Sequence, residues 1–88
     1  MGAVLVLNHN IVARAHNLTE SSQSPLAHAE LLCLQQAAAD LGAWRLLEAC
    51  LYVTLEPCPM CAGAVLQARI KTLVYGARSS RLGAVIWT

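Results

Sequence analysis

The alternation of apolar and polar stretches along the chain predicts strands and helices in a mixed order. Short apolar runs bounded by polar or turn-forming residues predict strands at residues 3–7, 11–16, 51–55 and 72–76. Longer runs with Leu and Ala at helical spacing predict helices from about Ala29 to Leu41 and from Cys58 to Ala68. The resulting order, β-β-α-β-α-β, has strands that lead into helices, which predicts a layered α/β fold.

The amino-acid composition indicates how large the domain is and where in the cell the protein would occur. The chain has 88 residues, 57% of them apolar, which is enough for one small domain over residues 1–88. No apolar run is long enough to span a bilayer, and Met1 to Leu7 lacks the basic flank of a signal peptide. We therefore expect a cytoplasmic protein without membrane association. The net charge of +1 does not by itself indicate nucleic-acid binding, although basic residues and no acidic ones follow Glu56.

Two cysteines, Cys58 and Cys61, stand three residues apart at the predicted start of the second helix. Residues at this spacing lie about 60° apart around a helix, so both sulfur atoms can face one point. Pro57 and Pro59 suit the entry to a helix, whose partial positive charge is expected to lower the pKa of both thiols. Two thiolates at this spacing suit zinc but do not complete its coordination.

The best candidate for a third ligand is His28, which stands where the first helical run begins. Three protein ligands with a fourth position open are typical of catalytic zinc. Glu30 follows two residues later, but residues two apart point about 200° apart on a regular helix. His28 and Glu30 can share a site only if His28 lies at the helix entry, so we place the regular helix from about Ala29.

Simpler interpretations exist for each of these residues. Cys58 and Cys61 could form a structural zinc knuckle or be core thiols without metal. Glu30 alone would be a first-turn glutamate that interacts favourably with the helix dipole. Cys33 and Cys50 neighbour no second motif, so we expect buried free thiols and no disulfide framework.

The pair His28-Ala29-Glu30 and Pro57-Cys58-Pro59-Met60-Cys61 resembles the zinc-dependent nucleobase deaminases, whose signature is His-x-Glu followed by Pro-Cys-x-x-Cys. Within that superfamily, the stretches from Leu55 to Ala64 and from Arg69 to Arg78 look like the bacterial-type tRNA adenosine deaminases. The resemblance covers nearly the whole chain, from Gly2 to about Ala84.

The resemblance implies a three-layer, cytidine-deaminase-like α/β fold with Zn2+ at the helix N-termini. His28, Cys58 and Cys61 would be the metal ligands, and Glu30 would transfer protons while a zinc-activated water attacks C6 of adenine. The reaction would convert adenosine to inosine at the anticodon wobble position of tRNA.

Three substrate contacts also follow from the resemblance. Asn17 matches a pocket asparagine eleven residues before the zinc histidine, although a turn asparagine is an equally good interpretation. The backbone N–H of Ala29 would contact the base, and Arg78 would follow the fourth strand as in the family's Gly-Ala-Arg. Ser79 replaces the family's usual acidic residue, which puts the contacts to neighbouring nucleotides in doubt.

Family members have a helix before the first strand and further elements after the fourth, so we expect this chain to be a partial domain truncated at both ends. One face of an apolar sheet would then be bare, which predicts an unstable monomer and a homodimer, or a heterodimer with another deaminase subunit. Two other functions stay open. One is deamination of a free base or nucleoside such as guanine or cytidine. The other is an inactive zinc-folded fragment or partner subunit.

Overall fold

The computed structural model describes residues 2–55 and 57–77. Its elements follow the predicted β-β-α-β-α-β order: β1 (Gly2–Leu7), β2 (Asn10–His16), α1 (Ala29–Leu41), β3 (Cys50–Leu55), α2 (Pro59–Gln67) and β4 (Thr72–Ala77). All six elements lie within two residues of the predicted bounds.

The strands form a mixed sheet in the order β2-β1-β3-β4. β1 pairs antiparallel with both β2 and β3, whereas β3 pairs parallel with β4. The β1–β2 hairpin turns through Asn8 and His9, whose φ angles are 52° and 65°. Two successive positive φ angles are typical of the type I′ turn, whose twist matches that of paired strands.

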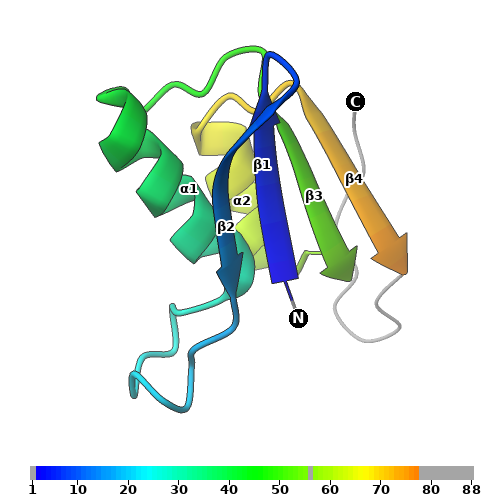
Figure 1. The fold of residues 1–88 in the computed structure, drawn as a ribbon. Coiled ribbons are helices and arrows are strands. Elements are labelled where there is room, and N and C mark those ends of the chain that lie inside the picture. The colour runs from blue at the N-terminus through cyan, green and yellow to red at the C-terminus, as the bar shows by residue number, and fades with distance from the viewer. Residues whose placement is uncertain (1, 56, 78–88) are drawn as a thin grey trace.

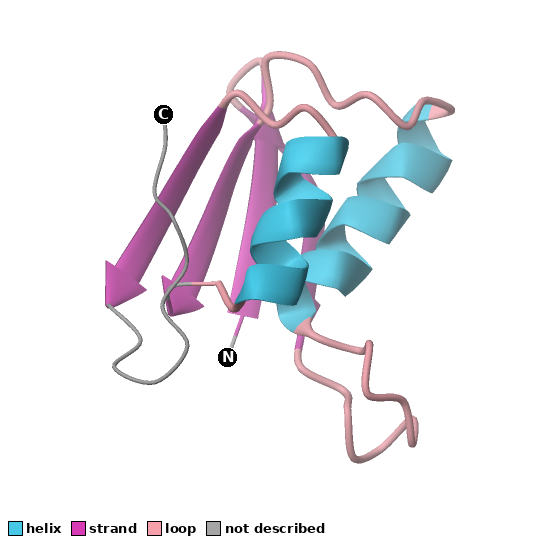
Figure 2. Cartoon of the chain, turned by 180° about the vertical axis from the view of Figure 1, so that it is seen from behind, coloured by secondary structure: helices cyan, strands magenta, loops and turns pink. Residues whose placement is uncertain are grey.

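Both helices cover one face of this sheet, as Figures 1 and 2 show from opposite sides. The core lies between this covered face and the helices. It includes buried aliphatic side chains from strands and helices: Leu5, Leu51, Leu73, Leu34 and Val65. The described residues therefore form the sheet and one helical layer of the expected three-layer fold. Within these ranges, no helix is long and apolar enough to cross a membrane.

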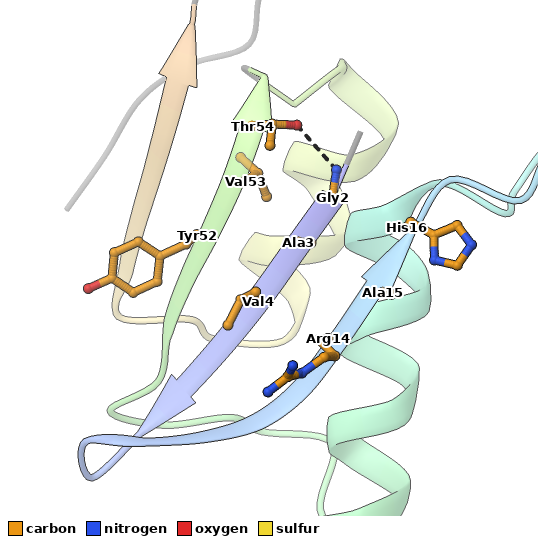
Figure 3. Close-up of a pocket in the computed structure, with 9 residues that line it drawn as sticks. All are labelled: Gly2, Ala3, Val4, Arg14, Ala15, His16, Tyr52, Val53 and Thr54. Atoms are coloured by element: carbon orange, nitrogen blue, oxygen red, sulfur yellow. Dashed lines mark hydrogen bonds between the residues drawn. The ribbon is translucent and has the colours of Figure 1, made fainter.

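The opposite face of the sheet, which we call the open face, has no helix over it within residues 2–55 and 57–77 (Figure 1). Tyr52 is 47% exposed and Val74 42% exposed on this face. Figure 3 shows a shallow hollow there of about 410 Å³, with Val4 between Arg14 and Tyr52. The expectation that one apolar face stays bare is confirmed for these residues.

Helix ends follow from local chain geometry. α1 begins at Ala29, as expected, because His28 is extended (φ −76°, ψ 149°) and occupies the N-cap position. Gly42 ends this helix in the left-handed conformation (φ 66°), which glycine adopts without steric cost. α2 begins one residue later than predicted, at Pro59, because Cys58 is also an extended N-cap residue (φ −70°, ψ 168°).

Candidate metal centre

The two helix N-termini meet at one end of the sheet, where β2 and β3 lead into α1 and α2 (Figure 2). His28 and Cys58 hold equivalent N-cap positions, and neither makes the side-chain hydrogen bond to its own helix that a usual N-cap residue makes. Their side chains are therefore free to face each other. Cys61 joins them from the first turn of α2.

His28, Cys58 and Cys61 form a compact cluster of potential ligand atoms, all within 4.8 Å of one another. The Nδ1 atom of His28 lies 3.5 Å from Sγ of Cys61 and 4.0 Å from Sγ of Cys58. Nitrogen and sulfur ligands of one tetrahedral zinc ion are separated by about 3.5 Å, from their usual bond lengths. The cluster predicted from the sequence is thus assembled at a spacing that suits a metal ion.

Glu30 is the one buried charged residue in the described chain, with 2% of its surface exposed. Its Oε1 atom has no hydrogen-bond partner among the described residues. A buried carboxylate oxygen without a partner is costly in a folded protein, so its retention calls for an explanation. A metal centre that needs an acid and base beside it provides one. The donor set and this unpaired oxygen together fit a catalytic zinc site.

The expected lowering of both thiol pKa values is wrong for Cys61. Burial raises the pKa of the Cys61 thiol, and the negative charge of Glu30 raises it further. The desolvation of a buried sulfur therefore outweighs the partial positive charge at the start of α2. A metal cation would reverse this balance, since coordination deprotonates a thiol outright.

The three predicted substrate contacts, Ala29, Asn17 and Arg78, lie outside the ligand cluster or outside the described residues. Ala29 is buried and is the first residue of α1, so its backbone N–H has no acceptor within the helix. The Oδ1 atom of Asn17 accepts hydrogen bonds from Thr19, from the backbone N–H at 2.9 Å and from Oγ1 at 2.8 Å. Arg78 lies outside the described residues.

The two cysteines outside the cluster are both free, and Asn17 is bonded within its own loop. Cys33 and Cys50 are both free thiols, as expected, but only Cys33 is buried. Cys50 is half-buried, which corrects the expectation for that residue. The pairing of Asn17 with Thr19 was not predicted. Its signal in the sequence was present, because an asparagine side chain often accepts from the backbone two residues on.

The fold, with its His-Cys-Cys cluster beside a buried glutamate, is that of the cytidine-deaminase-like class. The family model of the MafB19-like deaminases matches residues 1–86, and the chain belongs to that family. The resemblance seen in the sequence is therefore confirmed at the level of the family.

Among similar proteins, the tRNA-specific adenosine deaminase of Bacillus subtilis (strain 168) is 60% identical over 77 residues, which are 88% of this chain and 48% of the relative. The chain thus spans about half the length of this relative. A structure from a study of A-to-I editing by tRNA:A34 deaminases superposes with a TM-score of 0.93 at 50% identity, covering 96% of this chain and 61% of the other. Guanine deaminase from Bacillus subtilis superposes with a TM-score of 0.86 at 43% identity, covering 88% and 49%.

Proposed function

We propose that this chain deaminates adenosine to inosine at the anticodon wobble position of tRNA, with Zn2+ bound by His28, Cys58 and Cys61. The observation that supports this most is the cluster of three ligand atoms within 4.8 Å, beside the buried Glu30. The identity of 60% with a tRNA-specific adenosine deaminase points to the substrate.

In this proposal, each residue has a role that its position allows. Zinc bound here would act as a Lewis acid and lower the pKa of a water molecule toward about 7. Glu30 would carry one proton of that water to the adenine ring nitrogen and then the remaining hydroxyl proton, once its oxygen is bonded to C6, to the departing amine. A C6–O bond forms as the C6–N bond breaks, so adenosine and water give inosine and ammonia.

Substrate binding would use residues around the helix entry. The free backbone N–H of Ala29 would donate to the base, and Asn17 would contact the nucleoside from the preceding loop. Arg78, which follows β4 in the sequence, would contact a phosphate of the tRNA. These contacts are proposals carried by the resemblance.

Guanine is the main competing substrate, because a guanine deaminase shares the fold. The tRNA-specific enzyme of Bacillus subtilis is 60% identical and the guanine deaminase 43% identical, each over 88% of this chain. This difference favours tRNA adenosine.

We also propose that the chain works in the cytoplasm as a homodimer, or with another deaminase subunit. Large apolar side chains are exposed on α2, on the loop before α1 and on the open face, among them Leu26, Met60, Leu66, Tyr52 and Val74. Removing such surface from water is favourable by about 25 cal/mol per Å², and this gain offsets the entropic cost of association. Sedimentation at micromolar concentration should show a dimer, and a cooperatively melting monomer would contradict this.

The function is tested by incubating the zinc-loaded chain with a tRNA that carries adenosine at the wobble position. Digestion to nucleosides and mass spectrometry should detect inosine and no deamination of free guanine or cytidine. The Glu30→Gln variant is the matched control and should form inosine at least about 100-fold more slowly. Xanthine from guanine would identify the alternative enzyme, and no product from any substrate would indicate an inactive zinc-folded module.

A further inference from the structure

Asn17 lies at the start of the loop between β2 and α1, and this part of the loop is bonded to the entry of α1. The backbone N–H of Leu18 donates to the carbonyl of Ala27 at 2.9 Å, so the start of this loop is tied to the residue before His28. Asn17 and Thr19 are both half-buried. Asn17 therefore lies on a fixed segment beside the entry to α1.

The contacts of Asn17 determine the orientation of its amide. A backbone N–H can only donate, so the side-chain atom 2.9 Å from the Thr19 nitrogen must be the oxygen. The Thr19 hydroxyl donates to the same oxygen at 2.8 Å. A carbonyl oxygen has two lone pairs, and both are now engaged. Asn17 has only its NH₂ group left to offer a ligand.

Thr19 is itself held in place. Its carbonyl accepts the N–H of Ser24 at 3.2 Å, and the carbonyl of the adjacent Leu18 accepts the N–H of Ser22 at 2.9 Å. These bonds close the loop on itself, so Thr19 is a fixed support for the Asn17 amide.

We infer that Thr19 is a positioning residue, which orients Asn17 so that it donates to the substrate and cannot accept from it. This inference rests on the proposed function, in which Asn17 contacts the nucleoside. The group facing Asn17 must then be a hydrogen-bond acceptor, such as a ring nitrogen, a carbonyl oxygen or a ribose oxygen. Thr19 acts through Asn17 and is itself neither a proposed metal ligand nor a proposed substrate contact.

The test is a double-mutant cycle with KM, kcat and the Kd for the product inosine as readouts. Thr19→Val keeps the shape but removes the hydroxyl donor, and losing one hydrogen bond should raise KM and Kd about 3-fold to 10-fold while kcat changes less than about 2-fold. Thr19→Ser should restore wild-type binding. In the Asn17→Ala background, Thr19→Val should have no further effect. An unchanged KM and Kd, or an equal loss in both backgrounds, would overturn the inference.

Failure of the proposed function gives a different result. If the wild-type chain neither deaminates tRNA nor binds inosine, the function is wrong, and the orientation of Asn17 is then judged without substrate. Nitrogen-15 relaxation of the Asn17 side-chain amide should show greater mobility in Thr19→Val than in the wild type or Thr19→Ser. Equal mobility in all three proteins would show that Thr19 does not position Asn17.

Discussion

The two faces of the sheet differ in what covers them, although they are built from the same strands. On β3, Leu51 points to the covered face and has no exposed surface, whereas its neighbour Tyr52 points to the open face and is 47% exposed. The difference follows from the period of two along a strand, since consecutive side chains point to opposite faces. Two consecutive residues of one strand can therefore lie in the core and in solvent.

The candidate metal centre lies on the covered side of the sheet, whereas the surface available for association with another chain includes the open face. The covered face ends where α1 and α2 begin, and there it holds His28, Cys58, Cys61 and Glu30 together. The open face holds a hollow lined by residues that include Val4, Arg14 and Tyr52 (Figure 3), and among the described residues no group of three potential metal ligands lies beside it. Variants on the covered side should therefore affect fold and activity, and variants on the open side should affect association.

The largest effect is expected from Glu30→Gln at the edge of the covered face. Removing a general acid and base lowers the rate by about 10²-fold to 10⁴-fold. The zinc content should stay unchanged, because Glu30 is not one of the proposed ligands. The measurement is kcat on tRNA together with metal analysis. Full activity would exclude Glu30 from the mechanism, and loss of zinc would make it structural.

A pair of neighbouring variants compares the two faces directly. Leu51→Ala leaves a cavity in the core and should reduce the free energy of unfolding by about 2–5 kcal/mol. Tyr52→Ala on the open face should cost less than about 1 kcal/mol, within the range of strand propensities. Urea unfolding at a fixed zinc concentration measures both. Equal losses at every protein concentration would contradict the difference between the two faces. A midpoint for Tyr52→Ala that falls on dilution would identify the open face as the dimer interface.

Cys33 on α1 is buried against the covered face, so the free energy of unfolding should depend on pH through the ionisation of its thiol. Burial raises the pKa of the Cys33 thiol from its ordinary value of 9.0 to about 11. The unfolded chain then loses this proton first, so the metal-free protein should lose about 1.5 kcal/mol of stability between pH 9 and 10.5. Urea midpoints across this range give the slope, and Cys33→Ala should have a shallower one. Identical slopes would show that Cys33 ionises normally in the folded state.

The smallest effect is expected at the edge of the sheet. The Oε1 atom of Gln36 on α1 accepts the backbone N–H of Arg14 on the edge strand β2 at 3.1 Å. Gln36→Ala should cost about 0.5–1.5 kcal/mol and leave an edge donor free for pairing with another chain. Gln35→Ala, at an exposed neighbouring position, is the control. Urea unfolding should show a larger loss of stability for Gln36→Ala than for Gln35→Ala, and light scattering should show more association. No difference between the two would show that this contact does not protect the edge.

The parts of the site that the sequence predicted are those governed by local chain geometry. The placement of His28 before Ala29 followed from the need for His28 and Glu30 to face one point, and the structure has that helix start. The pKa of Cys61 was mispredicted because it depends on burial and on the charge of Glu30, which are set by tertiary packing. The hydrogen bonds between Thr19 and Asn17 depend on loop conformation, which apolar periodicity does not encode.

The central claim is that His28, Cys58 and Cys61 form one zinc site, and metal content tests it most directly. Elemental analysis of the wild-type chain, purified without chelators, should find one zinc per chain. Cys61→Ala should lose it, whereas Cys33→Ala, a buried thiol outside the cluster, should retain it. A wild-type chain without zinc, or a Cys61→Ala chain with unchanged zinc content, would contradict the account.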